Sequence, residues 1–340
     1  MPTEPEVDRP EFDADEEDGG GPVKSFLEHL EDLRWVLIKS IVAIGIGMLV
    51  CLIAADHVLA ILKGPLARAK IKYPGTNQIW TVSFGTNRLG VFRLDDEQQR
   101  SFAIGTNRFV PLKLEPAVIG TNLILTFRPD PNTDPASAQH LDIRLQGFGP
   151  VTAFVVALHV ALYGGIVLAS PFVFYFVAGF IFPALKMREK HYVYRGLGFG
   201  LTLFAAGVSF CYFVLLPVAL QASVMYANWM GLDANLWRAE EYISFVCKFM
   251  LGMGIGFQMP VVLLTLVRIG ILSYSTLSKM RKYMIVINLV LGALLTTPEV
   301  ITQVLMALPL QILYEISVWI AWYWERRDRK RAVREAKGAQ

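Results

Sequence analysis

The chain has 340 residues, of which 54% are hydrophobic and 18% are charged, and its mean hydropathy is +0.43. This composition is too apolar for an ordinary soluble domain and indicates an integral membrane protein. The formal net charge is only +3, so the distribution of charge is more informative than its sum. We find no cleavable signal-peptide pattern, no metal-ligand spacing and no Gly-rich phosphate loop, and therefore expect no cofactor, no metal and no nucleic-acid partner. Cys51, Cys211 and Cys247 lie in apolar runs and are expected to be buried.

Residues 1–24 form an acidic N-terminal segment that ends in a Gly-Gly-Gly-Pro sequence. It contains nine acidic residues: Glu4, Glu6, Asp8, Glu11, Asp13, Asp15, Glu16, Glu17 and Asp18. High charge with few apolar residues predicts a disordered tail. Such a tail can attract a basic partner, although solvation alone accounts for it.

Residues 25–66 are expected to hold an amphipathic entry helix and the first membrane span. An apolar stripe recurs at helical spacing at Phe26, Leu30, Leu33 and Leu37. Ser25 followed by Glu28 has the pattern of a capping box, which predicts that the helix begins at Ser25. Glu28, Glu31 and Asp32 lie off the stripe and give the helix an acidic face. Its simplest interpretation is a solvated face with Glu31 paired to Arg34.

Six apolar runs are candidates to cross a bilayer, at about 35–54, 151–180, 197–220, 243–267, 283–295 and 300–322. The last five belong to a predicted helical bundle over residues 150–324. The fifth run is short, because about 12 apolar residues make a helix of about 18 Å against a hydrocarbon core of about 30 Å. We therefore expect an all-α membrane protein whose last two helices are short. These helices either cross a locally thinned bilayer or form a re-entrant hairpin.

The basic residues predict the orientation of the six helices. They gather in the links between the second and third runs and between the fourth and fifth, and in a basic tail at 325–340. The link between the third and fourth runs has Arg238 alone against Asp233, Glu240 and Glu241. By the positive-inside rule, both termini are cytoplasmic. The long segment 67–149 does not count against this, because long loops translocate regardless of their charge.

Segment 67–149 differs in kind from the rest of the chain. Gly-Thr-Asn recurs at residues 75, 85, 105 and 120, between β-branched and aromatic runs such as 78–84 and 123–127. This pattern predicts short strands joined by turns, and hence a β-rich extracytoplasmic insertion. It serves either cargo binding or, more simply, a stabilising cap or partner contact.

Three polar residues, Gln258, Glu299 and Glu315, occur at predicted membrane depth, where such groups usually face a cavity or a partner. Each also has a structural interpretation. Gln258 can form an interhelical hydrogen bond, Glu299 can cap the sixth helix, and Glu315 can lie near the inner headgroups.

A series of short motifs resembles the TatC family, the multispanning subunit of the twin-arginine protein translocase. In chain order they are His29-Leu30-Glu31-Asp32-Leu33-Arg34, Gly64-Pro65-Leu66, Ser170-Pro171, Phe180-Ile181-Phe182-Pro183-Ala184-Leu185, Gly207, Phe210, Tyr212-Phe213, Pro217, Ser244-Phe245, Phe257-Gln258-Met259-Pro260, Arg281-Lys282-Tyr283, Leu294-Leu295-Thr296-Thr297-Pro298-Glu299, Gln303, Pro309 and Glu315. Each motif alone is weak, but they occur in register along nearly the whole chain. The insertion at about 70–145 is not covered by the resemblance.

The resemblance implies a receptor and core subunit of the inner (cytoplasmic) membrane that is not an enzyme. Its ligand would be the twin-arginine signal peptide of folded precursor proteins, and transport would draw on the proton-motive force. Glu189 matches the family's loop carboxylate, Asp32 matches the acidic residue before Leu-Arg, and Arg34 would orient its neighbours. Glu31 and Arg188 adjoin these positions. Two guanidinium groups need carboxylates within bidentate reach, which agrees with this assignment.

The resemblance also implies assembly with single-span subunits like TatA and TatB, and homo-oligomers within the complex. We expect Gln303, Thr302, Leu294 and Leu295 to contact a partner helix, because an amide facing lipid is costly unless another helix satisfies it. Gln258 stands where the family often has Glu, so we expect no proton titration there. The alternative function is a small-solute or ion transporter with Gln258 and Glu315 at a midplane site, but no internal repeat supports it.

Overall fold

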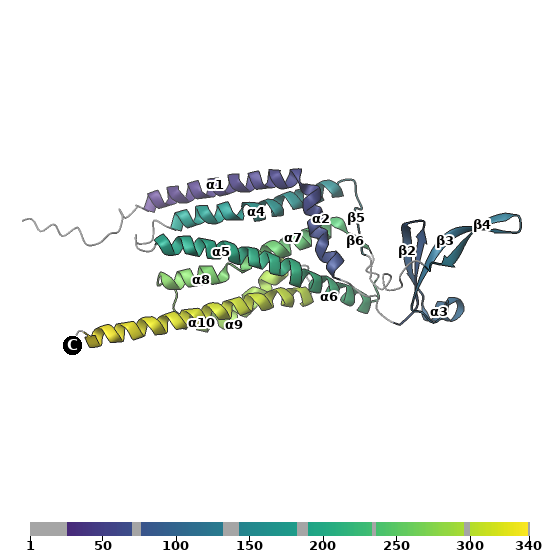
Figure 1. Ribbon diagram of the computed structural model, residues 1–340. Helices are drawn as coiled ribbons and strands as arrows, with labels where there is room; N and C mark the ends of the chain where they lie inside the picture. Colours follow the sequence, from purple (N-terminus) through teal and green to yellow (C-terminus); the bar gives the residue numbers. More distant parts are fainter. Residues whose placement is uncertain are drawn as a thin grey trace, which may run out of the picture.

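The computed structural model of the protein is a bundle of long helices with a small β-sheet beyond one end (Figure 1). The structure describes residues 26–69, 76–131, 143–181, 190–232, 236–295 and 300–338. Three sets of predictions fall outside these residues. They concern the acidic segment with the Ser25 capping box, the 182–189 link with Arg188 and Glu189, and Glu299 with its predicted role as a helix cap.

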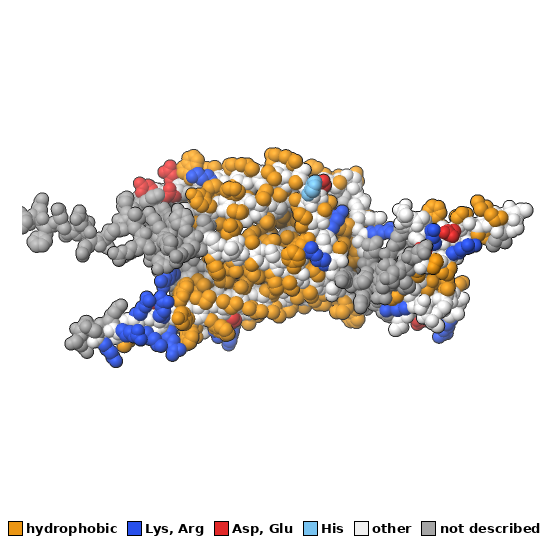
Figure 2. Space-filling model, in the orientation of Figure 1, with side chains coloured by type: hydrophobic (Ala, Val, Ile, Leu, Met, Phe, Trp, Pro, Cys, Tyr) orange, Lys and Arg blue, Asp and Glu red, His pale blue; other side chains and the backbone are white. Residues whose placement is uncertain are grey.

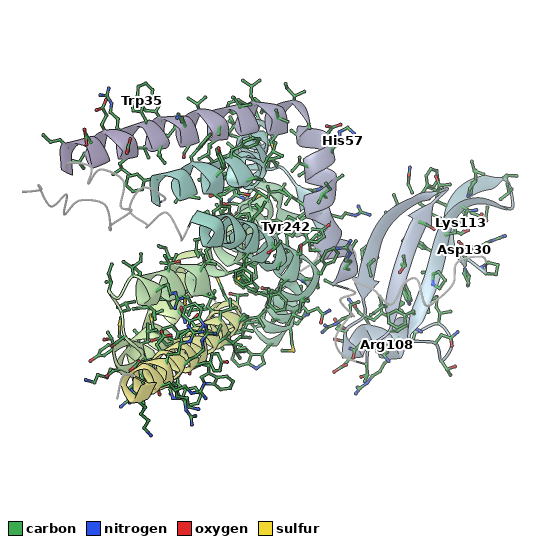
Figure 3. The ribbon with its side chains drawn as sticks, turned by 60° about the vertical axis from the view of Figure 1, so that its left-hand side comes forward. Trp35, His57, Arg108, Lys113, Asp130 and Tyr242 are labelled. Atoms are coloured by element: carbon green, nitrogen blue, oxygen red, sulfur yellow. The ribbon has the colours of Figure 1, made fainter. Side chains whose placement is uncertain are left out.

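The helices run back and forth along a common direction (Figure 1). They are α1 (Phe26–Ile53), α4 (Thr152–Ile181), α5 (Lys190–Phe210), the π-helical turn η4 (Cys211–Leu215), α6 (Leu216–Trp229), α7 (Ala239–Gly256), α8 (Met259–Arg268), α9 (Tyr274–Leu295) and α10 (Val300–Gly338). Five stretches are long and apolar enough to span a membrane: Leu30–Ile53, Thr152–Phe180, Gly198–Trp229, Ala239–Arg268 and Val300–Arg331. Apolar side chains cover the outside of the bundle (Figure 2), as expected for a multi-pass protein surrounded by lipid. Trp35 on α1, for example, points away from the other helices (Figure 3).

Inside the bundle, small residues allow close helix packing. A Cβ atom on Gly47 of α1 would lie 2.6 Å from the carbonyl oxygen of Gly165 in α4, so the two backbones touch where they cross. Small residues at such crossings are typical of membrane helices, which gain their packing energy from close contact. The main core lies among α4, η4, α6, α7 and α10, and includes the fully buried Leu216, Ile243 and Phe249. Cys211 and Cys247 belong to this core and Cys51 is also buried, as the sequence predicts.

Two of the predicted spans are interrupted helices. The third changes to π-helical geometry at η4 before Pro217, which lies in the first turn of α6. The fourth breaks between α7 and α8, before Pro260 in the first turn of α8. Proline has no N–H to donate to the carbonyl four residues earlier, so helices commonly deviate or restart at such positions.

The last two helices are longer than the sequence predicts. α9 begins at Tyr274, nine residues before the apolar run, and its 22 residues give a length of about 33 Å. α10 has 39 residues and continues without a break through the predicted basic tail as far as Gly338. The prediction of two short final helices is therefore wrong for helix length. The length of the apolar run underestimates the length of a helix that continues into polar sequence.

The segment between α2 and α4 contains a four-stranded sheet with strand order β2-β1-β3-β4. Its strands are β1 (Ile79–Phe84), β2 (Asn87–Arg93), β3 (Phe109–Ile119) and β4 (Asn122–Pro129), and α3 (Asp96–Phe102) lies between β2 and β3. β1 and β3 are parallel, and the other pairs are antiparallel. The repeated Gly-Thr-Asn sequence supplies turns: Gly85, Gly105 and Gly120 have φ of 60°, 62° and 64°, which only glycine adopts readily. Lys113 and Asp130 lie on the β3–β4 side of the sheet (Figure 3).

Helix α2 (Ala55–Arg68) crosses the end of the bundle nearest the sheet (Figure 1). Side chains of the third and fourth spans hold it by donating to carbonyl oxygens at its middle and at its C-cap. Tyr212 donates to Ile61 at 2.8 Å, Tyr242 donates to Leu62 at 3.0 Å, and Gln221 donates to Ala69. Figure 3 shows Tyr242 pointing toward α2. At the return to the bundle, β5 (Arg144–Gln146) pairs in parallel with β6 (Leu236–Arg238).

Candidate functional site

The predicted acidic face lies on the first turns of α1. Glu28 and Glu31 are exposed, and Asp32 is half-buried. Arg34 is exposed, and within α1 it forms no ion pair with Glu31, so that predicted pairing is wrong. Figure 2 shows acidic side chains at the start of α1. The Glu31 carboxylate is therefore available to a cationic ligand.

The link that carries Arg188 and Glu189 joins two helices at this same end of the bundle. α4 ends at Ile181, and α5 begins at Lys190, directly after Glu189 (Figure 1). α1 packs along α4, so the acidic turns of α1 and the ends of α4 and α5 belong to one end of the molecule. Residues 182–189 themselves lie outside the described part of the chain, so no distance joins Glu189 to Asp32.

Gln258 lies at the break between α7 and α8 and bonds across the bundle. Its Nε2 donates to the carbonyl oxygen of Gly200 in α5 at 2.8 Å. The side chain is half-buried. Gln258 therefore makes the interhelical hydrogen bond that the sequence analysis gives as its structural interpretation.

Glu315 pairs with a basic residue of the neighbouring helix. Its Oε2 lies 3.2 Å from Nη2 of Arg281, which joins α10 to α9. Tyr314, the residue before Glu315, is buried and donates its hydroxyl to the Leu277 carbonyl at 2.5 Å. Arg281 and Tyr314 therefore fix the end of the α9–α10 pair that Glu315 also occupies.

Two more polar contacts join α9 to α10. Nδ2 of the fully buried Asn288 donates to Oε1 of Gln311 at 3.1 Å. Nε2 of Gln303 donates to the Leu289 carbonyl at 2.8 Å. The Gln303 amide is thus satisfied within the bundle, and it needs no partner helix for this purpose.

The other residues of the predicted partner contact differ in exposure. Thr302 is fully buried, and Leu295 packs against the main core. Leu294 is 77% exposed at the end of α9, which makes it the most accessible of the four residues. The structure thus places Gln303 at the α9–α10 interface, buries Thr302, packs Leu295 against the core and turns Leu294 outward.

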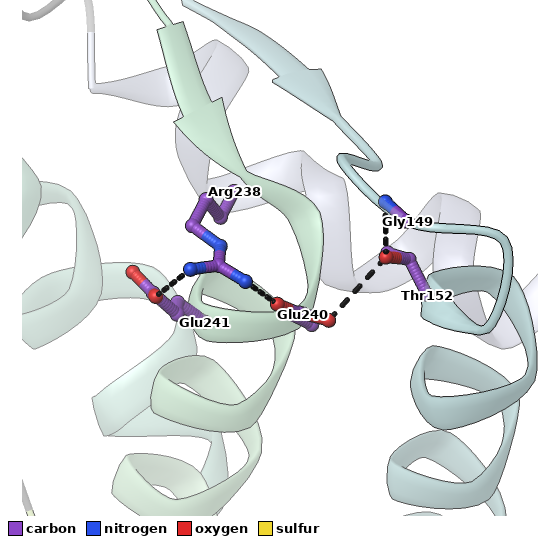
Figure 4. Close-up of polar contacts among 5 residues, drawn as sticks. All are labelled: Gly149, Thr152, Arg238, Glu240 and Glu241. Atoms are coloured by element: carbon purple, nitrogen blue, oxygen red, sulfur yellow. Dashed lines mark hydrogen bonds and ion pairs between the residues drawn. The ribbon is translucent and has the colours of Figure 1, made fainter.

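A polar cluster joins α4 to α7 at the opposite end of the bundle (Figure 4). Arg238 bonds to Glu240 and lies 3.4 Å from Glu241, while Glu240 accepts from Thr152 at 3.4 Å. Thr152 in turn accepts from the backbone N–H of Gly149 at 3.2 Å. This cluster anchors the point where the chain leaves the insertion and enters α4.

Sequence reasoning missed Asn288 and Gln311, and it did not pair Arg281 with Glu315. A signal existed, since Asn288 and Gln311 are amides inside apolar runs, and such residues usually bond across membrane helices. Among the described residues, no three His, Cys, Asp or Glu side chains come together as a candidate metal site. Asn288 and Gln311 instead bond to each other inside the bundle.

Comparison with known proteins identifies the family. The model of the family described as "TatC: Sec-independent protein translocase protein (TatC)" matches residues 28–309. The chain belongs to the TatC family. The matched range begins in α1 and ends inside α10.

Curated TatC proteins are similar over different lengths. The Akkermansia muciniphila protein is 38% identical over 192 residues, which cover 56% of this chain and 55% of that relative. This chain therefore matches about half the length of that protein. The Aquifex aeolicus protein is 35% identical over 58% of this chain and 82% of its own length. The Desulforapulum autotrophicum protein is 28% identical over 86% of this chain and 82% of its own.

The solved structure of a twin-arginine translocase receptor, TatC, has a similar fold. It superimposes with a TM-score of 0.59 and 28% identity, covering 87% of this chain and 98% of that chain. A second structure of TatC, in DDM, gives a TM-score of 0.60 and 29% identity. Nearly the whole of the solved TatC chain therefore has a counterpart in this protein.

Proposed function

We propose that this TatC protein is the receptor and core subunit of a twin-arginine translocase, and that it binds the signal peptides of folded precursor proteins. The observation that carries the proposal is the acidic first part of α1, with exposed Glu31, at the bundle end where α4 gives way to α5. Glu189 directly precedes α5. Asp32 and Glu189 would receive the two guanidinium groups, because arginine pairs with carboxylates in a bidentate manner. Arg34 and Arg188 would orient these carboxylates.

We further propose six membrane crossings with both termini in the cytoplasm of a bacterial inner membrane. The crossing that the five most apolar stretches do not include is α9, the fifth in chain order, because basic residues in its first turns lower its mean hydropathy. Single-span subunits like TatA and TatB would dock on the outer face of α9 at Leu294 and assemble into oligomers. Transport would draw on the proton-motive force.

A small-solute transporter is the second candidate, and the polar contacts count against it. Such a protein would keep polar groups available at a midplane site. Here Gln258 is bonded to Gly200, and Glu315 is paired with Arg281. The groups that suggested a solute site are therefore already engaged with the bundle.

Binding of a purified twin-arginine peptide to the detergent-solubilised protein tests the proposal. We expect Glu189→Ala and Glu189→Arg to abolish binding, because either change removes a carboxylate from an otherwise basic link. Asp32→Ala should weaken binding less, since Glu28 and Glu31 lie beside it. Glu97→Ala, which removes an exposed carboxylate in α3, is the matched control and should bind normally. Wild-type binding by both Glu189 variants would contradict the proposal.

A further inference from the structure

The last turns of α10 carry their basic residues on one side of the helix. At 100° per residue, six of them fall within an arc of about 140°. We call this set the basic face: Arg326, Arg327, Lys330, Arg331, Arg334 and Lys337, all exposed. Figure 2 shows blue side chains gathered on this projecting end of the molecule.

The opposite side of the same turns is occupied by contacts with the bundle and within the helix. Asp328 lies 3.9 Å from Arg268 of α8, whose guanidinium also lies 5.5 Å from the ring of Trp324. Glu325 pairs with Arg329 at 3.4 Å. These contacts fix the rotation of α10 about its axis, so the basic face is directed away from α8.

Lipid headgroups can neutralise only the near part of the basic face. Trp319, Trp322 and Trp324 mark the membrane interface, where tryptophan is enriched, and α10 continues past them as one helix. From Arg326 to Lys337 the helix rises about 16 Å, twice the Debye length of about 8 Å at physiological ionic strength. Arg331, Arg334 and Lys337 therefore lie beyond the reach of the headgroups and are accessible to another anionic partner.

The chain itself contains such an anionic partner at the same end of the molecule. α1 begins at Phe26 at the bundle end from which α10 projects (Figure 1). Residues 4–18, which precede it, contain nine acidic residues and one base, Arg9. Eight residues separate Asp18 from Phe26 and 22 separate Glu4 from it, which reach at most about 28 and 75 Å. Successive contacts lead from α1 to α10 through α4, α7 and α9. At 8–10 Å between the axes of each of these four pairs, α1 and α10 are at most about 40 Å apart.

We propose that the acidic segment of residues 4–18 binds the basic face of α10 in the same molecule. The contact is electrostatic and multivalent: eight net negative charges in the segment, nine acids less one base, meet six positive charges on the helix. Because both partners belong to one chain, the effective concentration is high and no further protein is required.

The pairing has a consequence for the signal-peptide site, and this consequence rests on the proposed function. The acidic segment lies only ten residues before the acidic turns of α1, so unpaired it would compete with them for a cationic peptide. When the segment is bound to α10, its carboxylates are already paired and do not compete for the peptide. The experiment below does not use the peptide, so its outcome is independent of the proposed function.

Zero-length carbodiimide crosslinking of the full-length protein in lipid nanodiscs tests the contact. We expect carboxylates of residues 4–18 to crosslink to Lys330 and Lys337, as read by mass spectrometry of the peptides. The Lys113–Glu115 pair, 2.8 Å apart in the sheet, provides an internal reference crosslink. Raising salt from 0.1 to 1 M shortens the Debye length from about 10 to about 3 Å and should lower the yield roughly fivefold.

Arg334→Gln and Arg329→Gln form a charge-matched pair. Each removes one arginine, but only Arg334 belongs to the basic face, so only Arg334→Gln should lower the yield. Mixing ¹⁴N- and ¹⁵N-labelled protein separates contacts within one molecule from contacts between two. Mixed-isotope crosslinks, equal yields for the two variants, or loss of the crosslink when nanodiscs contain phosphatidylglycerol would each overturn the proposal. The last result would assign the basic face to anionic lipid.

Discussion

At the scale of single residues, two hydroxyl groups replace hydrogen bonds that prolines remove from helices. Pro65 has no N–H, so the carbonyl of Ile61, four residues earlier, lacks its donor within α2. Tyr212 donates its hydroxyl to that oxygen. In α4, Pro171 likewise leaves the Val167 carbonyl without a donor, and Ser170 Oγ donates to it at 2.8 Å. Side-chain hydroxyls commonly satisfy such groups in membrane helices, where water is scarce.

We expect Tyr212→Phe to lower the free energy of unfolding by about 1 kcal/mol, because it leaves the Ile61 carbonyl unpaired. The ring would still contact the Arg68 guanidinium, which lies 4.9 Å from its centroid, so the effect isolates the hydroxyl. Thermal unfolding in one detergent measures the change. Tyr175→Phe removes an exposed hydroxyl from α4 and is the control. Equal midpoints for both variants and the wild type would mean that the hydrogen bond contributes nothing.

At the scale of elements, Gln258 joins the break between α7 and α8 to α5. Pro260 removes the donor for the Gly256 carbonyl, and the helix restarts at Met259. The bond from Gln258 to Gly200 then fixes this weakened point to the neighbouring span. Gln258 therefore contributes to packing and carries no titrating proton.

Gln258→Leu should reduce stability by about 1 kcal/mol and leave the pH dependence of transport unchanged. Glutamine does not ionise, so its removal cannot shift a titration. Export of a twin-arginine precursor by membrane vesicles between pH 6 and 8, with thermal unfolding alongside, measures both quantities. Gln258→Glu is the matched variant of the same size. Higher activity with a new pH dependence in that variant would show that position 258 does more in transport than contribute to packing.

The sequence predicts the elements of this fold better than their contacts. Apolar runs located the first four spans, and the Gly-Thr-Asn repeats marked positions where three glycines adopt positive φ. Hydropathy could not locate the start of α9 or the extent of α10, because both continue into charged sequence. Pairs such as Asn288–Gln311 depend on how each helix is rotated about its axis, which a single sequence does not fix. The acidic face of α1 was predicted, but its distance from Glu189 depends on residues 182–189.

At the scale of the whole molecule, the two ends of the bundle carry different elements. The start of α1, the α4–α5 link and the basic end of α10 lie at one end, while α2 and the sheet lie at the other (Figure 1). The 22 residues of α9 are long enough to cross a core of about 30 Å, although its apolar run, 284–295, is only about 12 residues long. Length alone thus permits a full crossing, and the basic first turns would lie at the inner headgroups.

We therefore expect a cysteine at Glu299 to be labelled from outside the cell. Position 299 lies between the end of α9 and the start of α10, so a full crossing by both helices exposes it outside, whereas a re-entrant hairpin does not. The background replaces Cys51, Cys211 and Cys247 with alanine, since all three are buried in apolar surroundings. A membrane-impermeant maleimide applied to intact spheroplasts should react with Glu299→Cys, and Arg331→Cys should react only after permeabilisation. Labelling of both positions only in permeabilised cells would indicate that α9 and α10 enter and leave the membrane on the same side.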